Sequence, residues 1–495
     1  MWIGTSSVTI SKLPVRQVAL ALIAVSVGCS GASGPAATGP GGAQTSVGSD
    51  AGSGSGGAFG GSGGSGSSGG TNGGGGSSAG GVSTAPEAGA PSVDASVRSE
   101  TDAAGTEAAA VTVAVGSGDS APSVDAMAAL GMCTVPTGAK ASDAQAAYTK
   151  WKNDLVVTSG ARGFRRVTRP NSPGAMNTSN SEGTGYGMIL AVAMDDQALF
   201  DDLWRYEQLF LDGNGLMNWE IDPTGAGPTG EGTGAATDGD EDMAYALLWA
   251  DHRWGGKGSL SDTYRNFALK QIDLVWMHEV DQSRAQALAP GDSFPSGAGD
   301  LNISYFAPAY YRLFGQANGK QSDWNKVVES SYTVLAATLN AANKNTTNGL
   351  VPAWSTPAGV PQSPNASLPT NHQLDSCRTP FRLGQDYCWY GEPRAKAYLA
   401  KISAFYQQIG ASHIVNGYNL DGTPNPTNPT VNQSAAFVGP AGVGAMSDPA
   451  FAMLRDQAYA GVATLNELDG STYYTESWTA LSLVMMNGEY WNPTQ

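Results

Sequence analysis

The chain has 495 residues, with 43 acidic against 26 basic side chains and a formal net charge of -17 at pH 7. This excess of negative charge argues against nucleic acid or an anionic membrane surface as a partner, because both repel an acidic protein, whereas a neutral polymer does not. The four cysteines and four histidines are scattered, and no spacing among them suits zinc. We therefore expect neither a metal nor a cofactor.

Residues 1–29 have the pattern of a secretory signal. Lys12 and Arg16 precede an apolar run over residues 18–27, which is too short to span a bilayer. Gly28 and Cys29 then resemble the end of a bacterial lipoprotein signal, in which the cysteine is acylated. We expect export, either with membrane attachment through a lipidated Cys29 or as plain secretion.

Residues 30–124 contain almost nothing that could build a hydrophobic core. Glycine and serine dominate to about residue 82, and Phe59 is the only aromatic residue of the segment. Such a composition cannot offset the loss of chain entropy on folding, so we expect a disordered tether with an r.m.s. span of roughly 50–60 Å. Residues 125–495 are expected to form one large domain, with a monomer as the expected state.

Helical periodicity runs through the rest of the chain. A first helix is expected to begin at an N-cap formed by Ser142 and Asp143. Apolar residues then recur at three- and four-residue spacing in nine further segments: 183–194, 196–211, 240–254, 261–280, 304–316, 322–342, 393–408, 448–465 and 474–487. Credible strands are few. The sequence predicts an all-α fold, a helical bundle or a toroid, whose loops build the functional site.

The functional interpretation starts from one stretch, which lies directly before an apolar run. Its sequence is Ser181-Glu182-Gly183-Thr184-Gly185-Tyr186-Gly187-Met188. It places a carboxylate among three alternating glycines at the start of a buried helix, which indicates that something approaches that acid closely. Glu182 is the candidate catalytic acid. A catalytic acid must hold its proton near neutrality, and a second carboxylate nearby favours this.

The second carboxylate is expected from Ala236-Thr237-Asp238-Gly239-Asp240-Glu241-Asp242. Four acids within five residues repel one another, so we expect this segment to be a loop that faces water, a cation or a sugar. The alternative is a solvated turn that caps the next helix.

A third candidate acid is Asp375, which precedes Arg378 by three residues. The two could simply form an ion pair. A base that activates water must stay ionised, however, and we expect the neighbouring guanidinium to hold the pKa of Asp375 down. The three carboxylates could then act as an acid, a base and a charge stabiliser, one role each.

Large aromatic residues are expected in the loops between the helices. Sugar rings stack on such faces, and although any single aromatic residue could belong to the core, as a set beside carboxylates they favour a carbohydrate cleft. They are Trp219, Tyr305 with Phe306, Trp354, Trp389 with Tyr390, and Tyr473 with Tyr474. In an oxidising compartment Cys377 and Cys388 could close a short disulfide, the alternative being two buried thiols.

Together these motifs resemble glycoside hydrolase family 8, and most of all its clostridial-type endo-β-1,4-glucanases. The matching motifs are, in chain order, residues 181–188, 236–244, 304–309, 349–352 and 375–382 with Trp389. The resemblance implies an (α/α)6 barrel of six inner and six outer helices, with an acidic cleft at one end and an inverting mechanism. It implies no metal and no cofactor.

The resemblance also implies residue roles. Glu182 is similar to the general acid, Asp375 to the general base, and Asp238 to the carboxylate that binds and distorts the sugar. The expected substrate-binding or site-ordering residues are Trp219, Tyr305, Arg378, Tyr473 and Trp354. The chain departs from the family at Ala353, where aspartate is common, and at Pro380-Phe381.

The function that the resemblance implies is a secreted endo-β-1,4-glucanase acting on cellulose or mixed-linkage β-glucan. A xylanase or a chitosanase of the same fold remains an alternative. A non-catalytic glycan-binding surface protein is a second alternative, against which all three carboxylates are present. In each case the partner is a polysaccharide and not nucleic acid.

Overall fold

The computed structural model describes residues 131–172, 174–293, 300–364, 368–425, 433–468 and 473–494. The expected signal over residues 1–29, with Cys29, and the expected tether over residues 30–124 lie outside the described residues. The helices and strands below all belong to the domain that was expected to begin at residue 125.

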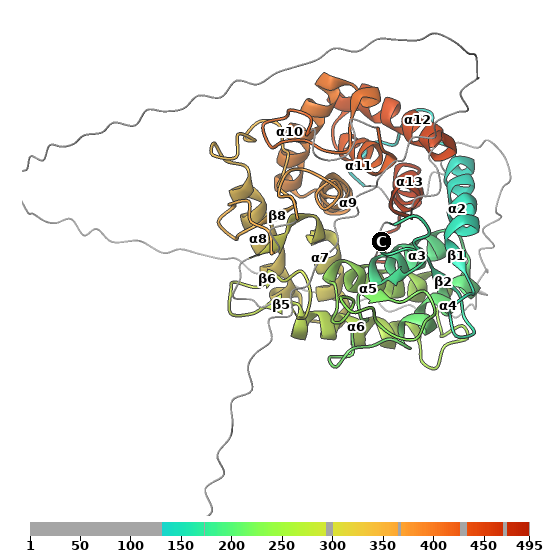
Figure 1. The fold of residues 1–495 in the computed structure, drawn as a ribbon. Helices are drawn as coiled ribbons and strands as arrows, with labels where there is room; N and C mark the ends of the chain where they lie inside the picture. Colours follow the sequence, from blue (N-terminus) through green and yellow to red (C-terminus); the bar gives the residue numbers. More distant parts are fainter. Residues whose placement is uncertain are drawn as a thin grey trace, which may run out of the picture. The chain divides into compact units, whose positions relative to one another are not determined.

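Twelve α-helices occur among the described residues, in two sets that alternate along the chain (Figure 1). The inner set is α3 (Ser181–Ala193), α5 (Thr237–Trp254), α7 (Pro308–Asn318), α9 (Thr379–Tyr390), α11 (Ala435–Ala445) and α13 (Tyr473–Met486). The outer set is α2 (Ala141–Leu155), α4 (Gln197–Glu207), α6 (Tyr264–His278), α8 (Gln321–Thr338), α10 (Pro393–Ile409) and α12 (Ala452–Leu468).

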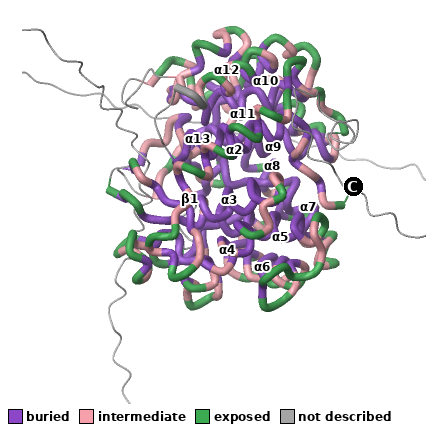
Figure 2. The backbone as a smooth tube through the Cα atoms, turned by 90° about the vertical axis from the view of Figure 1, so that its right-hand side faces the viewer, coloured by how far each residue is buried: buried purple, intermediate pink, exposed green. Residues whose placement is uncertain are grey.

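The inner helices close a ring. Each packs against the next in chain order, and α13 packs back against α3, while every outer helix packs against an inner neighbour. The inner helices α3, α11 and α13 are apolar or small on all sides and are buried along nearly their whole length, whereas the outer helices keep a polar face. Figure 2 shows the buried inner turns surrounded by exposed outer turns and loops. The predicted (α/α)6 barrel is confirmed.

Paired two-residue strands and short 3-10 helices connect the barrel helices. Each strand pairs antiparallel with one partner: β1 (Val156–Val157) with β2 (Arg166–Val167), β3 (Ser179–Asn180) with β4 (Glu220–Ile221), β5 (Val280–Asp281) with β6 (Ala287–Leu288), and β7 (Leu301–Asn302) with β8 (Trp354–Ser355). The 3-10 helices are η1 (Ile303–Tyr305), η2 (Ala411–His413) and η3 (Pro449–Phe451). The pair β3–β4 leads directly into α3 and sets the position of Glu182.

Two inner helices, α9 and α11, were not predicted. Helix α11 contains Pro440 and three glycines, which have poor helix propensity. Its glycines allow close packing, because a Cβ at Gly439 would lie 2.3 Å from Ser482 Oγ and one at Gly442 would lie 2.8 Å from Met486 Sδ. Contact with α13 therefore favours this helix, and the local sequence alone does not.

The acidic run over residues 238–242 is neither a loop nor a solvated turn, so both readings were wrong. It forms the first turn of α5, and all four acids are buried. Each has a partner in the barrel: Gln271 Nε2 donates to Asp240 Oδ1 at 3.0 Å, and Tyr311 OH donates to Glu241 Oε2 at 3.1 Å. Arginines on the facing helix α9 pair with Asp238 and Asp242. The repulsion between the acids is offset by these partners.

The first helix begins one residue before the expected cap. Helix α2 has Lys140 at its N-cap position, without a side-chain cap hydrogen bond, and Ser142 and Asp143 lie inside the first turn. Tyr459 OH donates to the Asp143 carboxylate at 2.7 Å. The Asp143 side chain therefore joins α2 to α12 and does not cap its own helix.

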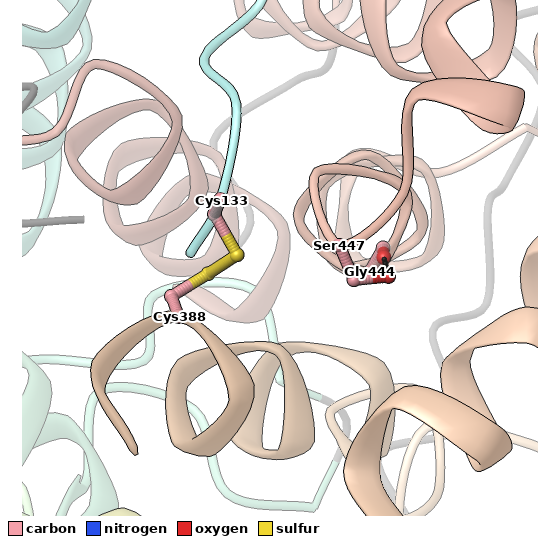
Figure 3. Close-up of a disulfide and its surroundings, with 4 residues drawn as sticks. All are labelled: Cys133, Cys388, Gly444 and Ser447. Atoms are coloured by element: carbon pink, nitrogen blue, oxygen red, sulfur yellow. Dashed lines mark hydrogen bonds between the residues drawn. A yellow bond between two sulfur atoms is a disulfide. The ribbon is translucent and has the colours of Figure 1, made fainter. Parts of the chain in front are cut away.

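The disulfide joins Cys133 to Cys388 (Figure 3). Cys377 is a buried free thiol. Of the two alternatives for Cys377 and Cys388, the bridge between them was wrong, and the pair of buried thiols holds for Cys377 alone. Cys388 lies near the end of α9 and Cys377 just before its start, so at helical rise the two are about 16 Å apart, far beyond disulfide reach. The observed bridge ties the segment before α2 to an inner helix 255 residues away.

The described part of the chain contains neither a membrane span nor a metal cluster. No helix in the described ranges is long and apolar enough to cross a bilayer. No three or more His, Cys, Asp or Glu side chains in the same ranges are grouped so that they could hold a metal ion. The absence of a cofactor and the monomeric state stay predictions.

Candidate active site

One pocket, at the end of the ring where the inner helices begin, brings the three candidate carboxylates together. Including its open mouth it measures about 570 Å³. Glu182 and Asp238 lie in the first turns of α3 and α5, and Asp375 lies in the loop before α9. The lining residues are Arg169, Asn180, Ser181, Glu182, Trp219, Ala236, Asp238, Tyr305, Leu374, Asp375 and Tyr474.

Arg378 joins two of the carboxylates. Its Nη1 donates to Glu182 Oε2 at 2.8 Å and to Asp238 Oδ2 at 2.6 Å. The same nitrogen donates to Tyr186 OH at 3.0 Å, while Nε donates to Ser304 Oγ at 3.1 Å. Arg378 is almost fully buried. A single guanidinium thus holds carboxylates from two neighbouring helices at one point.

Glu182 is the more exposed of these two carboxylates. Its side chain is 16% exposed, against 3% for Asp238. Tyr473 OH donates to Glu182 Oε1 at 2.6 Å, so a phenol holds one carboxyl oxygen and a guanidinium holds the other. Glu182 is therefore fixed in orientation while it still faces the pocket, as a proton donor to a bound molecule must be.

Close packing between helices explains the glycines that follow Glu182. A Cβ at Gly183 would lie 2.8 Å from the Tyr473 ring, and one at Gly185 would lie 2.8 Å from Asp242 Cβ. On the facing helix, a Cβ at Gly239 would lie 2.6 Å from the carbonyl carbon of Ser181. Because no side chain intervenes, α3 approaches α5 and α13 closely enough for Glu182 and Asp238 to share one arginine.

Asp238 has a pKa near neutrality. Its burial raises the pKa to about 7; the Arg378 guanidinium opposes this increase, and the charges of Glu182 and Asp242 add to it. The nearby second carboxylate that the sequence predicted is therefore present. Neutral pH is therefore close to the pKa of Asp238 itself.

Burial raises the pKa of Asp375, so the expectation that Arg378 would hold it down was wrong. The guanidinium and a hydrogen bond from Gln373 lower this pKa, but burial outweighs them. Gln373 Nε2 donates to Asp375 Oδ2 at 3.1 Å, and Asp375 N donates to Gln373 Oε1 at 3.0 Å. Arg378 makes its ion pairs with the other two carboxylates, and Asp375 lines the pocket beside them.

The aromatic residues are more buried than expected. Trp219, Tyr305 and Tyr474 line the pocket. Trp219 Nε1 donates to the carbonyl of Glu231 at 2.7 Å, so this indole can offer only its ring to a ligand. The Arg378 guanidinium lies 5.0 Å from the centre of the Tyr305 ring.

The other predicted aromatic residues lie behind the pocket wall. Trp354 is fully buried, and its side chain helps to lower the pKa of Asp375 through a hydrogen bond. Trp389 and Tyr390 belong to helix α9 and not to a loop. Tyr473 is the first residue of α13 and contacts Glu182. Tyr473 and Trp354 thus hold carboxylates of the site, and the aromatic rings that line the pocket are those of Trp219, Tyr305 and Tyr474.

The sequence analysis missed four polar residues of the site. Arg169 lines the pocket and pairs with Glu220 on β4, and no local pattern marks it. Gln373 holds Asp375. Asn180 and Ser181 line the pocket beside Glu182. Asn180 is the N-cap of α3, a position that favours asparagine, and it was missed because the helix was expected to begin at residue 183.

Comparison with known proteins identifies the family of the chain. The sequence profile of Glycosyl hydrolases family 8 matches residues 123–488. The chain is 35% identical to Endoglucanase A of Acetivibrio thermocellus over 352 residues, 70% of each chain. It is 36% identical to Endoglucanase 2 of Ruminiclostridium josui over 347 residues, 70% of this chain and 71% of the relative.

Solved structures share the fold. The apo structure of Beta-1,3-1,4-glucanase from Paenibacillus sp. X4 aligns with a TM-score of 0.64 and 25% identity, over 73% of this chain and 96% of that chain. Rex8A from Paenibacillus barcinonensis, complexed with xylose, aligns with a TM-score of 0.56 at 19% identity, over 71% and 94%. From its motifs, its helical ring and these matches, the chain belongs to glycosyl hydrolase family 8.

Proposed function

We propose that this glycoside hydrolase is an exported, inverting endo-β-1,4-glucanase that cleaves internal bonds of cellulose or mixed-linkage β-glucan. The observation that carries the proposal is the carboxylate arrangement: Arg378 joins Glu182 to Asp238, and Asp375 lines the same pocket. The endoglucanase names of the two relatives and the glucanase name of the solved structure support the choice of substrate.

The reaction is a single displacement. Glu182 gives its proton to the oxygen of the scissile bond as that bond breaks. Asp375 takes a proton from a water molecule whose oxygen attacks the anomeric carbon from the opposite face. Because water attacks directly, no covalent sugar intermediate forms and the anomeric configuration inverts.

Asp238 acts on the charge of the transition state. It lies on the same arginine as Glu182 and is almost fully buried. Its ionised form would stabilise the positive charge that develops on the sugar ring as the bond breaks. Arg378 keeps Glu182 and Asp238 close together against their mutual repulsion, so the acid and the charge stabiliser can act on the same sugar.

The raised pKa values of Asp238 and Asp375 together set the acid side of the activity profile, because both carboxylates act in the ionised form. A general base works only when it is ionised, and burial raises the pKa of Asp375 above its ordinary 3.8. Activity should therefore fall as the pH decreases through these raised pKa values, at a higher pH than for exposed aspartates.

Reducing-sugar release by the full chain tests the proposal on carboxymethylcellulose, barley β-glucan, xylan and chitosan, with NMR detection of the anomer first formed. We expect release of the α-anomer from the β-glucans. Activity confined to xylan or chitosan would overturn the substrate, and a β-anomer would overturn the mechanism.

Two substitutions test the roles. Glu182→Gln and Asp375→Asn should each lower kcat on β-glucan by at least about 10³-fold, with folding and glycan binding retained. Glu329→Gln is the matched control, because this glutamate is 64% exposed and lies on the outer helix α8. Near-normal turnover by either pocket variant would contradict the assignment.

Export with attachment through a lipidated Cys29 is the proposed location, and it rests on the signal-like residues 1–29. The full chain should then separate with the membrane fraction of a bacterial host. Cys29→Ala should release it into the soluble exported fraction. If the unsubstituted chain is already soluble outside the cell, export without a lipid anchor is correct.

A further inference from the structure

Ser181 has a buried hydroxyl that no described residue satisfies. The residue is 1% exposed, and its Oγ has no hydrogen-bond partner among the described side chains and backbone. Leaving such a group unpaired costs about 1–3 kcal/mol. Ser181 nevertheless lines the pocket, next to Glu182 in the chain. A polar group bound in the pocket would supply the partner that the described residues do not.

The surroundings of Ser181 hold its hydroxyl in place. Ser181 N donates to the carbonyl of Trp219 at 3.0 Å, which ties the start of α3 to a pocket-lining aromatic residue. A Cβ at Gly239 would lie 2.7 Å from Ser181 Oγ, so the hydroxyl packs on a bare glycine that offers no side-chain partner. Its position relative to Trp219 and Glu182 is thus fixed before any ligand binds.

Asn180 adds a donor beside this hydroxyl. Its Oδ1 accepts a hydrogen bond from Gly183 N at 3.0 Å and caps helix α3. Because the carboxamide oxygen is used by the helix, the orientation of the amide is set and its Nδ2 remains for another acceptor. Asn180 also lines the pocket. No described residue accepts a hydrogen bond from this nitrogen.

We propose that Asn180 and Ser181 together bind the hydroxyl groups of the sugar unit that lies beside Glu182, and thereby contribute to substrate specificity. Neighbouring hydroxyls of a pyranose ring are spaced for two adjacent polar groups, and each hydroxyl can both donate and accept. The inference rests on the proposed glucanase function, because it assigns a contact to the same substrate.

A purely structural reading of Ser181 can be tested against a second serine. Ser482, on the inner helix α13, is also fully buried and its Oγ also lacks a partner within the described ranges. Ser482 does not line the pocket. The two serines share burial and chemistry and differ in access to a ligand, so Ser482→Ala is the matched control for Ser181→Ala.

The experiment measures binding and turnover with cellopentaose, using the full chain. Ser181→Ala should lower kcat/KM by about 10-fold or more, the worth of one neutral hydrogen bond. Its free energy of unfolding should stay equal or rise, because an unpaired polar group is removed. Ser482→Ala should change stability in the same direction and leave kcat/KM within twofold of wild type. Unchanged kcat/KM in Ser181→Ala would overturn the proposal.

Binding to a non-hydrolysing protein separates this inference from the proposed function. In a Glu182→Gln background, adding Ser181→Ala should weaken cellopentaose binding about 10-fold by calorimetry. Asn180→Asp in the same background keeps the helix cap but loses the donor, so binding should weaken while stability is retained. If the two substitutions weaken cellopentaose binding but the wild-type protein does not hydrolyse β-glucan, only the proposed glucanase function is overturned. Equal binding in all three proteins, or none in any, would overturn the inference.

Discussion

Two ion pairs join α5 to α9, and they differ in what they face. Asp238 and Asp242 are four residues apart on α5, as are Arg378 and Arg382 at the start of α9, so each set points from one side of its helix. We call Arg378–Asp238 the upper pair and Arg382–Asp242 the lower pair. In the upper pair, Arg378 also binds Glu182, which lines the pocket. Both members of the lower pair are only 1% exposed.

The number of carboxylates explains the difference. In the lower pair, Arg382 binds Asp242 through two nitrogens at 2.7 and 2.8 Å, with its guanidinium 5.2 Å from the centre of the Tyr310 ring. One cation there meets one anion. In the upper pair, one cation serves both Asp238 and Glu182. A surplus negative charge remains, and it adds to the burial that raises the pKa of Asp238 to about 7. Under the proposed mechanism, the same kind of contact is structural in the lower pair and catalytic in the upper pair.

Arg378→Lys should have the largest effect, and it acts on activity. Lysine keeps the charge but loses the planar fork that reaches Glu182, Asp238 and Ser304 together. We expect kcat on barley β-glucan to fall by about 10³-fold, or about 4 kcal/mol in the activation barrier. Chemical denaturation should show a smaller loss of stability. Turnover within tenfold of wild type would break the distinction between the pairs.

Arg382→Met should act on stability. It leaves the Asp242 carboxylate buried without its cation, so the free energy of unfolding should fall by about 3 kcal/mol, as measured in urea. The kcat of the protein that remains folded should change only a few-fold. Adding Asp242→Leu removes the unpaired charge and should recover much of the loss. A double variant no more stable than the single one would show that the lower pair does more than balance charge.

The loop behind the upper pair gives a check with acid. Burial lowers the pKa of His372 to about 4, while its Nδ1 lies 3.0 Å from the carbonyl of Val351 and its Nε2 lies 3.2 Å from Tyr406 OH. The unfolded chain therefore binds this proton more readily than the folded one, and stability is lost as the pH falls from about 6.5 towards 4. Between pH 8 and pH 5 wild type should lose about 2 kcal/mol more than His372→Gln.

Unfolding curves at the two pH values measure this difference. An equal loss in both proteins would mean that His372 is accessible to protons in the folded state, and that the loop carrying Asp375 opens in acid.

Neutralising the lower pair should have the smallest effect. In Arg382→Gln with Asp242→Asn, the Asp242 charge that raises the pKa of Asp238 is lost, while the loss of the arginine cation acts in the opposite sense. The pH profile of kcat/KM should therefore shift by less than about half a unit. A shift of a full unit or more would place the lower pair within the catalytic electrostatics and remove the contrast.

Much of the site could be predicted from local sequence. Three alternating glycines after Glu182, before an apolar run, mark the buried start of α3, and the structure confirms that position. Helical spacing located ten of the twelve α-helices in the described ranges, and several ordered motifs identified the family. These features depend on residues within one or two helical turns of one another, so periodicity and motif spacing report them directly.

Only the tertiary structure determined the contacts between groups that are distant in the chain. Helix α11 is stabilised by its contact with α13, the acids after Asp238 are buried because helices α6, α7 and α9 supply partners, and Cys388 meets Cys133 across 255 residues. Arg378 lies three residues from Asp375 yet forms its ion pairs with Glu182 and Asp238, 196 and 140 residues away. Only closure of the ring brings these groups within reach, because local spacing determines what one helix presents and packing determines what it meets.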